Sequence, residues 1–183
     1  MVEAAEEMKV LVGEMVAARK EKNRLQPDEE VDELLGPPAT RQQLAELERL
    51  LGKALPPSYK AFMELHNGWD DFEGEFQILS VEDRQGAMVK ARVVELGGFF
   101  VEQELENPFA TWGFLVALGV TGGRLAFLDP RTVRADGEMD LVAFEYTQEE
   151  HRFGSFAEFL RHDLNLQREI IKDEREGQSD DGS

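Results

Sequence analysis

From Leu55 to Trp69 the chain reads LPPSYKAFMELHNGW, a stretch that combines a helix start, an apolar face and a helix stop. Proline suits the first turn of a helix, where its missing N–H costs nothing, so Pro56 or Pro57 marks the start. Asn67-Gly68 then ends the helix, because these residues readily leave the helical conformation. The side chains that fall on one side of it are Tyr59, Phe62, Met63 and His66. The stretch therefore predicts a short amphipathic helix.

Three capping boxes, each a Ser or Thr followed three residues later by an acid or amide, predict further helix starts. They are Thr40 with Gln43, Ser80 with Asp83, and Ser155 with Glu158. The first of these helices should end at Gly52 and pack against the opening helix as a hairpin, and the second should stop at Gly97-Gly98. Between Val2 and about Leu25, apolar residues at three- and four-residue steps predict one more amphipathic helix.

Apolar runs between these helices predict an antiparallel sheet. A glycine turn, Thr121-Gly122-Gly123, joins two of the runs and indicates a hairpin, and another run follows after a polar loop. The predicted strands are 76–79, 114–120, 124–129 and 141–146. The residues before the first strand, WDDFEGE at 69–75, predict a solvated acidic loop. Helices together with sequential strands indicate an α+β fold.

The composition fits a soluble globular protein with one core. The chain has 183 residues, of which 42% are hydrophobic and 32% charged, and a globule of this length buries roughly 70% of its unfolded surface. It shows neither a signal-peptide pattern nor an apolar run long enough to cross a membrane, so we expect a cytoplasmic protein. The absence of cysteine excludes disulfides, thiolate zinc sites and thiol nucleophiles.

The balance of charge is strongly acidic. The chain carries 38 Asp and Glu against 20 Lys and Arg, a formal net charge of −18. Binding to DNA or RNA depends on cations that displace counterions from phosphate, so we expect no nucleic acid ligand, and an anionic membrane surface is disfavoured too. Two interpretations stay open. The charge serves solubility alone, or it attracts a basic protein partner, whose encounter rate a complementary field raises about 10-fold to 1000-fold at low salt.

No group of residues has the spacing of an active site or a metal site. His66, His151 and His162 have no histidine partner at i,i+4 and form no HExxH pattern. The glycines at 122 and 123 are followed by a predicted strand, where a phosphate cradle needs a helix N-terminus. The acidic loop lacks the ligand spacing of an EF-hand. We therefore expect neither catalysis nor a cofactor nor a bound metal.

Several short motifs in a fixed order carry a resemblance to a known family. They are Leu51-Gly52, Leu55-Pro56, Tyr59, Phe62 and Asn67-Gly68, then Phe76-Gln77-Ile78-Leu79-Ser80-Val81-Glu82, then Asp129 after the glycine-linked strands, and finally Ser155-Phe156-Ala157-Glu158-Phe159-Leu160. In this order, over roughly Thr40 to Leu164, the chain resembles the SMI1/KNR4 family of the SUKH superfamily.

The resemblance implies an α+β fold with a mostly antiparallel, curved sheet flanked by helices. This chain departs from the minimal family pattern at both ends. We expect an N-terminal helical arm over residues 1–38, the family domain over 39–172, and a disordered acidic tail over 173–183, where charged and small residues offer no apolar anchor. Known members are mostly protein-binding modules, and many are bacterial immunity proteins. The resemblance therefore implies a non-enzymatic module that binds and neutralises a cognate toxin, such as a nuclease.

The acidic loop supplies the candidate partner-binding residues, which are Trp69, Asp70, Asp71, Glu73 and Glu75. An aromatic anchor beside carboxylates is typical of a hot spot for a basic partner. The alternative for Trp69, and equally for Trp112, is ordinary packing in the core or at its rim. Two other functions stay open. One is a regulatory scaffold that forms a homodimer through the N-terminal helix, and the other is an enzyme or small-ligand binder whose pocket the sequence does not reveal.

Overall fold

An antiparallel sheet of sequential strands organises the molecule. The computed structural model describes residues 2–27 and 34–180. Within these residues seven strands pair in the order β1-β2-β3-β4-β5-β6-β7, so each strand lies beside its neighbour in sequence. The strands are β1 (Leu34–Leu35), β2 (Trp69–Glu73), β3 (Phe76–Ile78), β4 (Phe114–Gly119), β5 (Arg124–Asp129), β6 (Asp140–Glu145) and β7 (Gln148–Phe153). The α+β fold and the antiparallel meander predicted from the sequence are confirmed.

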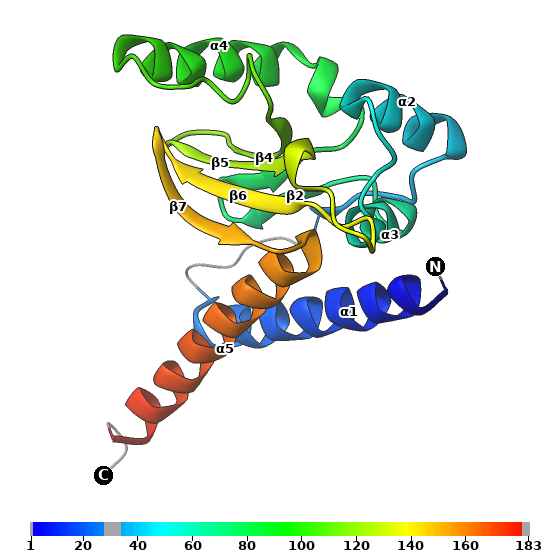
Figure 1. Cartoon of the computed structure of the whole chain (residues 1–183). Coiled ribbons are helices and arrows are strands. Elements are labelled where there is room, and N and C mark those ends of the chain that lie inside the picture. Colours follow the sequence, from blue (N-terminus) through cyan, green and yellow to red (C-terminus); the bar gives the residue numbers. More distant parts are fainter. Residues whose placement is uncertain (1, 28–33, 181–183) are drawn as a thin grey trace.

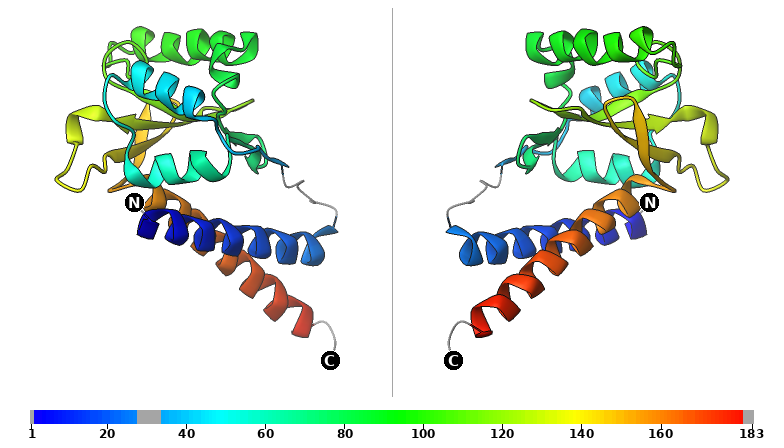
Figure 2. Two further views of the ribbon diagram at one scale, coloured as in Figure 1. Left: turned by 90° about the vertical axis from the view of Figure 1, so that its right-hand side faces the viewer. Right: turned by 90° about the vertical axis from the view of Figure 1, so that its left-hand side faces the viewer.

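Helices cover both faces of this sheet (Figure 1). They are α1 (Val2–Leu25), α2 (Arg41–Leu51), α3 (Pro57–Leu65), α4 (Ala87–Glu102) and α5 (Phe156–Asp180), with two short 3-10 turns, η2 (Asp83–Gln85) and η3 (Pro130–Thr132). The side views show α4 on one side of the sheet and α1 and α5 on the other (Figure 2).

Alternation along β5 explains why both faces need a cover. Leu125 and Phe127 point into the cluster beneath α4, whereas Leu128 belongs to the larger core formed with α1, α2, α3 and α5. Successive side chains of a strand point to opposite faces, so an apolar run such as this one leaves no face for water. The sheet is therefore the middle layer of three.

The N-terminal helix belongs to the main core. Its apolar face, Met8, Leu11, Val12 and Met15, is buried in the same cluster as the residues of α3 and α5. Glutamates spaced by seven on α1 meet arginines spaced by seven on α5, in the pairs Glu7 with Arg161, Glu14 with Arg168 at 3.2 Å, and Glu21 with Arg175 at 2.7 Å. Because the partners rise together along both helices, α1 and α5 run parallel, and their repeat is that of a coiled coil. The predicted amphipathic helix is confirmed. The main hydrophobic core contains residues from both sides of the boundary expected at residue 38.

The two helices predicted at the start of the family motif are also confirmed. Thr40 caps α2 with both arms of the capping box, since Gln43 N donates to Thr40 Oγ1 at 3.2 Å and Thr40 N donates to Gln43 Oε1 at 2.7 Å. Gly52 ends α2 in the left-handed conformation, with φ 73°. Pro57 occupies the first position of α3.

Both predicted ends of one helix are wrong. The Ser80–Asp83 capping box precedes only the short turn η2, and α4 begins at Ala87. The helix that should stop at Gly97-Gly98 continues to Glu102 as α4. Asn107 Nδ2 donates to Gly97 O at 3.3 Å, and a Cβ at position 97 would lie 3.2 Å from that nitrogen. Gly97 therefore allows the loop after the helix to approach closely, and it does not end the helix.

Two predictions about irregular segments are wrong as well. The predicted acidic loop is mostly strand β2, and the tail predicted to be disordered from residue 173 continues α5 to Asp180. Ile171 is buried, Arg175 pairs with Glu21 of α1, and Glu174 accepts a hydrogen bond at 2.6 Å from Gln26, just after α1. These contacts stabilise a segment whose composition alone offers little to pack. Residues 181–183 lie outside the described residues. The same holds for residues 28–33 of the expected N-terminal arm.

Candidate functional site

The Asn67-Gly68 pair fixes the place where β2 begins. Asn67 Oδ1 accepts a hydrogen bond from Val81 N at 3.0 Å, and its Nδ2 donates to Glu82 Oε2 at 2.7 Å. Gly68 has φ 90°, and a Cβ there would lie 2.7 Å from the backbone nitrogen of Ser80. The pair thus ties the end of α3 to the segment after β3, and it positions the acidic residues that follow.

Trp69 does not form the exposed aromatic anchor expected from the sequence. Its side chain is 0% exposed and packs edge-on against Phe72, with ring centroids 5.2 Å apart. The Arg19 guanidinium of α1 lies 4.8 Å from the centre of its ring, an attractive cation–π contact. The alternative of core packing is therefore the correct one for this residue.

Asp70 and Asp71 lie together with Asp83 of η2. Asp70 is exposed and Asp71 is half-buried. Burial, followed by the nearby carboxylates of Asp83 and Asp71, raises the pKa of Asp70 above its ordinary value. Asp71 itself has φ 51° at an irregularity in the pairing of β2 with β3. We call these three residues the Asp70 cluster.

Glu73 is turned away from this cluster toward α5. It forms an ion pair with Arg124 and a hydrogen bond with Asp163, which is only 3% exposed. Burial is the main influence that raises the pKa of Asp163 to about 9, and the Glu73 carboxylate adds to it. Burial also opposes the charge of Glu73, but Asp163, Arg124 and Arg19 outweigh it and lower the pKa of Glu73. The two pKa shifts run in opposite directions, so at neutral pH the pair favours holding one proton, and burial favours Asp163 as its place.

A cavity of about 450 Å³ lies beside this carboxyl pair. It is lined by Arg19, Lys22, Asn23, Phe72, Glu73, Gly74, Asp163, Leu166, Gln167 and Ile170. One protonated and one ionised carboxyl can exchange a proton with a ligand, as in many acid–base sites. Here Gln167 donates to Asp163 at 2.6 Å, and Arg19 donates to the carbonyl oxygens of Asp71, at 3.0 Å, and Phe72. These contacts explain the pair as the polar joint that fastens the β2–β3 hairpin to α1 and α5.

Glu75, the last predicted site residue, is exposed in the turn between β2 and β3. Its carbonyl oxygen accepts a hydrogen bond from Val120 N at 2.7 Å. The structure therefore separates the five predicted residues into three places. Asp70 and Asp71 share the Asp70 cluster, Glu75 lies at the turn, and Trp69 and Glu73 belong to buried contacts.

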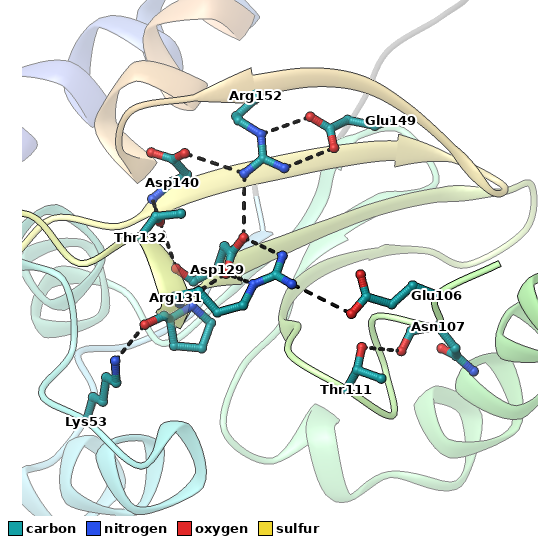
Figure 3. Close-up of polar contacts among 11 residues, drawn as sticks. Lys53, Glu106, Asn107, Thr111, Asp129, Arg131, Thr132, Asp140, Glu149 and Arg152 are labelled. Carbon is teal, nitrogen blue, oxygen red and sulfur yellow. Dashed lines mark hydrogen bonds and ion pairs between the residues drawn. The ribbon is translucent and has the colours of Figure 1, made fainter.

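Sequence reasoning missed a second network of charges, around Asp129 at the end of β5 (Figure 3). Asp129 is 1% exposed and binds Arg131 in a bidentate manner, at 2.8 Å to both Nε and Nη2, with Arg152 at 3.5 Å. Burial opposes the charge of Asp129, but the hydrogen bonds from Arg131 outweigh it and lower the pKa. This aspartate of the family motif therefore has a structural role, joining η3 to β6 and β7.

A basic rim borders that network. The Arg131 guanidinium lies 4.4 Å from the centre of the half-buried Trp112 ring, and Lys53 Nζ donates to Pro130 O at 2.6 Å. Both cations line a hollow of about 480 Å³ between α2 and the turn that precedes β4. Arg131 is paired with Asp129 and, at 3.6 Å, with Glu106, so carboxylates partly balance the cations of this rim.

Comparisons with known proteins identify the family. The model of the SMI1 / KNR4 family (SUKH-1) matches residues 38–162. A comparison with curated proteins gave no significant match. Among residues 2–27 and 34–180, no group of three or more His, Asp or Glu side chains is placed to hold a metal ion. In the same part of the chain, no helix has the length and apolar character needed to span a membrane.

Proposed function

We propose that this chain, which belongs to the SMI1/KNR4 family (SUKH-1), acts as a non-enzymatic immunity protein that binds and neutralises a toxin. The observation that carries the proposal is the family match over residues 38–162, because the family suggests an immunity-type binding module. The buried carboxylates of the three-layer fold also support a non-enzymatic role, because they form hydrogen bonds and ion pairs with other groups of the protein.

We place the toxin on the Asp70 cluster and the neighbouring Glu75. Three carboxylates lie close together in the Asp70 cluster. Burial is the main cause of the raised pKa of Asp70, and repulsion from the other two carboxylates raises it further. A cation from a partner relieves such repulsion, so the cluster gains favourable interactions on binding that it lacks in the free protein.

The charge of the whole chain supports a basic toxin, such as a nuclease. A formal net charge of −18 creates a field that attracts the cationic groove in which a nuclease receives phosphate. Carboxylates that fill this groove replace the phosphates of the substrate. Inhibition by simple occlusion then requires no chemistry from the bound protein.

The alternative of a scaffold that dimerises through residues 1–38 finds little support. The apolar face of α1 is already used within the chain, against α3 and α5. Glutamates beside this face are paired with arginines of α5. Self-association through the buried face of α1 would require this helix to leave the core.

Co-expression with the protein encoded beside this chain tests the proposal. We expect the two proteins to co-purify and to give a complex with one toxin per chain. The exchange Asp70→Lys should slow association several-fold at low salt, because charges at an interface act mainly on the association rate. Glu104→Lys, the same exchange at an exposed residue after α4, is the matched control. The proposal fails if the two proteins do not bind, and the proposed surface fails if both variants behave alike.

A further inference from the structure

The most exposed apolar side chains of the described chain lie on α4. Val94 is 77% exposed and Val101 is 68% exposed. With Ala87, Ala91 and Gly98 they are spaced by three and four residues, so they form one face of the helix, which we call the α4 face. Val89, Leu96 and Phe100 are buried on the opposite side, against the sheet. The α4 face therefore points away from the sheet, and Figures 1 and 2 show no described segment over it.

We propose that the α4 face is the contact between two copies of this chain, with the two α4 helices packed antiparallel about a two-fold axis. The proposal does not depend on the toxin, and none of the residues of the Asp70 cluster belongs to the α4 face.

The α4 face is complementary to itself in size. In an antiparallel pair centred at Leu96, a residue a given number of positions before Leu96 in one copy lies level with the residue the same number of positions after Leu96 in the other copy. Val94 then meets Gly98 of the second copy, and Ala91 meets Val101, so a larger side chain faces a smaller one in every pair. The two-fold axis repeats both contacts, as an isologous interface requires. A hollow of about 460 Å³ between α4 and residues 107–110 provides additional space beside Val94 and Val101.

Charge explains why a second copy fits this face better than a basic partner. The segment Ala87–Glu102 carries two cations, Lys90 and Arg92, and two anions, Glu95 and Glu102, and is neutral within a chain of net charge −18. Two equally acidic molecules repel each other least where their surfaces are neutral, whereas a basic protein is drawn to the acidic parts. Glu95 lies near its counterpart in the second copy across the two-fold axis, and Arg92 balances it within each copy through an ion pair at 2.6 Å.

The expected dimer is weak and depends on salt. A helix of 16 residues is about 24 Å long, so its face buries less than the roughly 1,600 Å² of a standard interface, and we expect a dissociation constant in the micromolar range. Salt screens the repulsion between two acidic chains and leaves apolar contacts intact. Dimerisation should therefore strengthen as salt increases.

Sedimentation equilibrium of the full chain, from micromolar to several hundred micromolar protein, tests the proposal. We expect a monomer–dimer equilibrium for the unmodified chain and at least a tenfold weaker one for Val94→Glu and for Val101→Glu. Val133→Glu changes another exposed valine, outside α4, and should dimerise normally. Circular dichroism checks that every variant is folded. A monomer at all concentrations, or dimers that both α4 variants leave unchanged, overturns the proposal.

Discussion

Asn67 and Gly68 show how strongly two small residues determine the local structure. The sequence predicted only that they end a helix, and the structure adds that they join three segments. Asn67 N donates to Pro37 O at 2.6 Å, and its side chain bonds Val81 and Glu82. Gly68 lies where no other residue fits, because both its φ and the nearby backbone of Ser80 exclude a Cβ. The family motif at this point is therefore explained by packing and backbone geometry.

The exchange Gly68→Ala should lower the free energy of unfolding by about 2 kcal/mol or more, since it adds strain at a positive φ and a contact with backbone that cannot yield. Urea denaturation measures the change. Gly13→Ala is the control, because Gly13 lies in α1 with open space around it. The free energy of unfolding of that variant should rise by about 0.5–1 kcal/mol, as is usual for alanine in place of glycine in a helix. Equal stability of the two variants would refute this account of Gly68.

Asp163 makes stability depend on pH in an unusual direction. Its pKa rises from 3.8 to about 9 on folding, so the folded chain keeps a proton that the unfolded chain releases. The resulting stabilisation is complete below the unfolded value and is lost as the pH rises toward 9. Asp163→Asn imitates the protonated form. We expect its melting temperature to exceed that of the unmodified chain at pH 8 and to match it near pH 4.

Asp173→Asn provides the control for this titration, because Asp173 is exposed on the same helix. It should leave the pH profile of stability unchanged. A profile of Asp163→Asn that runs parallel to that of the unmodified chain from pH 4 to 8 would show that Asp163 is ionised in the folded protein.

At the scale of elements, the helix pair α1 and α5 combines a core contact with a ladder of charges. Met15 is 0% exposed, so Met15→Ala should destabilise the protein by about 2–4 kcal/mol. Arg168→Gln removes a partly exposed ion pair and should cost less than about 1 kcal/mol. Chemical denaturation of both variants measures the difference. If Met15→Ala leaves stability unchanged, α1 is a detachable arm and the fold described above is wrong in this region.

Most elements with strong periodicity or clear caps could be predicted from the sequence, although the Ser80–Asp83 box precedes only the turn η2. The hairpin of β4 and β5 has apolar runs around a glycine turn, and α2 has a complete capping box. Strand β7 reads QEEHRF, with five exposed residues, because it is stabilised by backbone pairing with β6. Such an edge strand has no apolar alternation to reveal it. The acidic segment at 69–75 resembled a loop because Asp is rare in strands.

At the scale of the whole molecule, the candidate site was predictable in composition but not in geometry. The acid excess and the carboxylates of residues 70–75 could be read from the sequence. Their separation into the Asp70 cluster, the turn and the half-buried Glu73 could not, because it depends on partners far away in the chain. Asp163 lies ninety positions after Glu73, and Arg19 approaches from α1. Tertiary packing alone determines which carboxylates stay available to a partner.

Titration of the toxin's activity with this chain tests the central claim most directly. If the chain neutralises the toxin by occupying its active site, activity should fall linearly and reach its minimum at one chain per toxin, with no further loss on longer incubation. Asp70→Lys should require a higher concentration at low salt, because it weakens the attraction to a basic partner. Full inactivation by a small fraction of one equivalent, increasing with time, would reveal an enzyme. Undiminished toxin activity in an excess of the chain would contradict neutralisation itself.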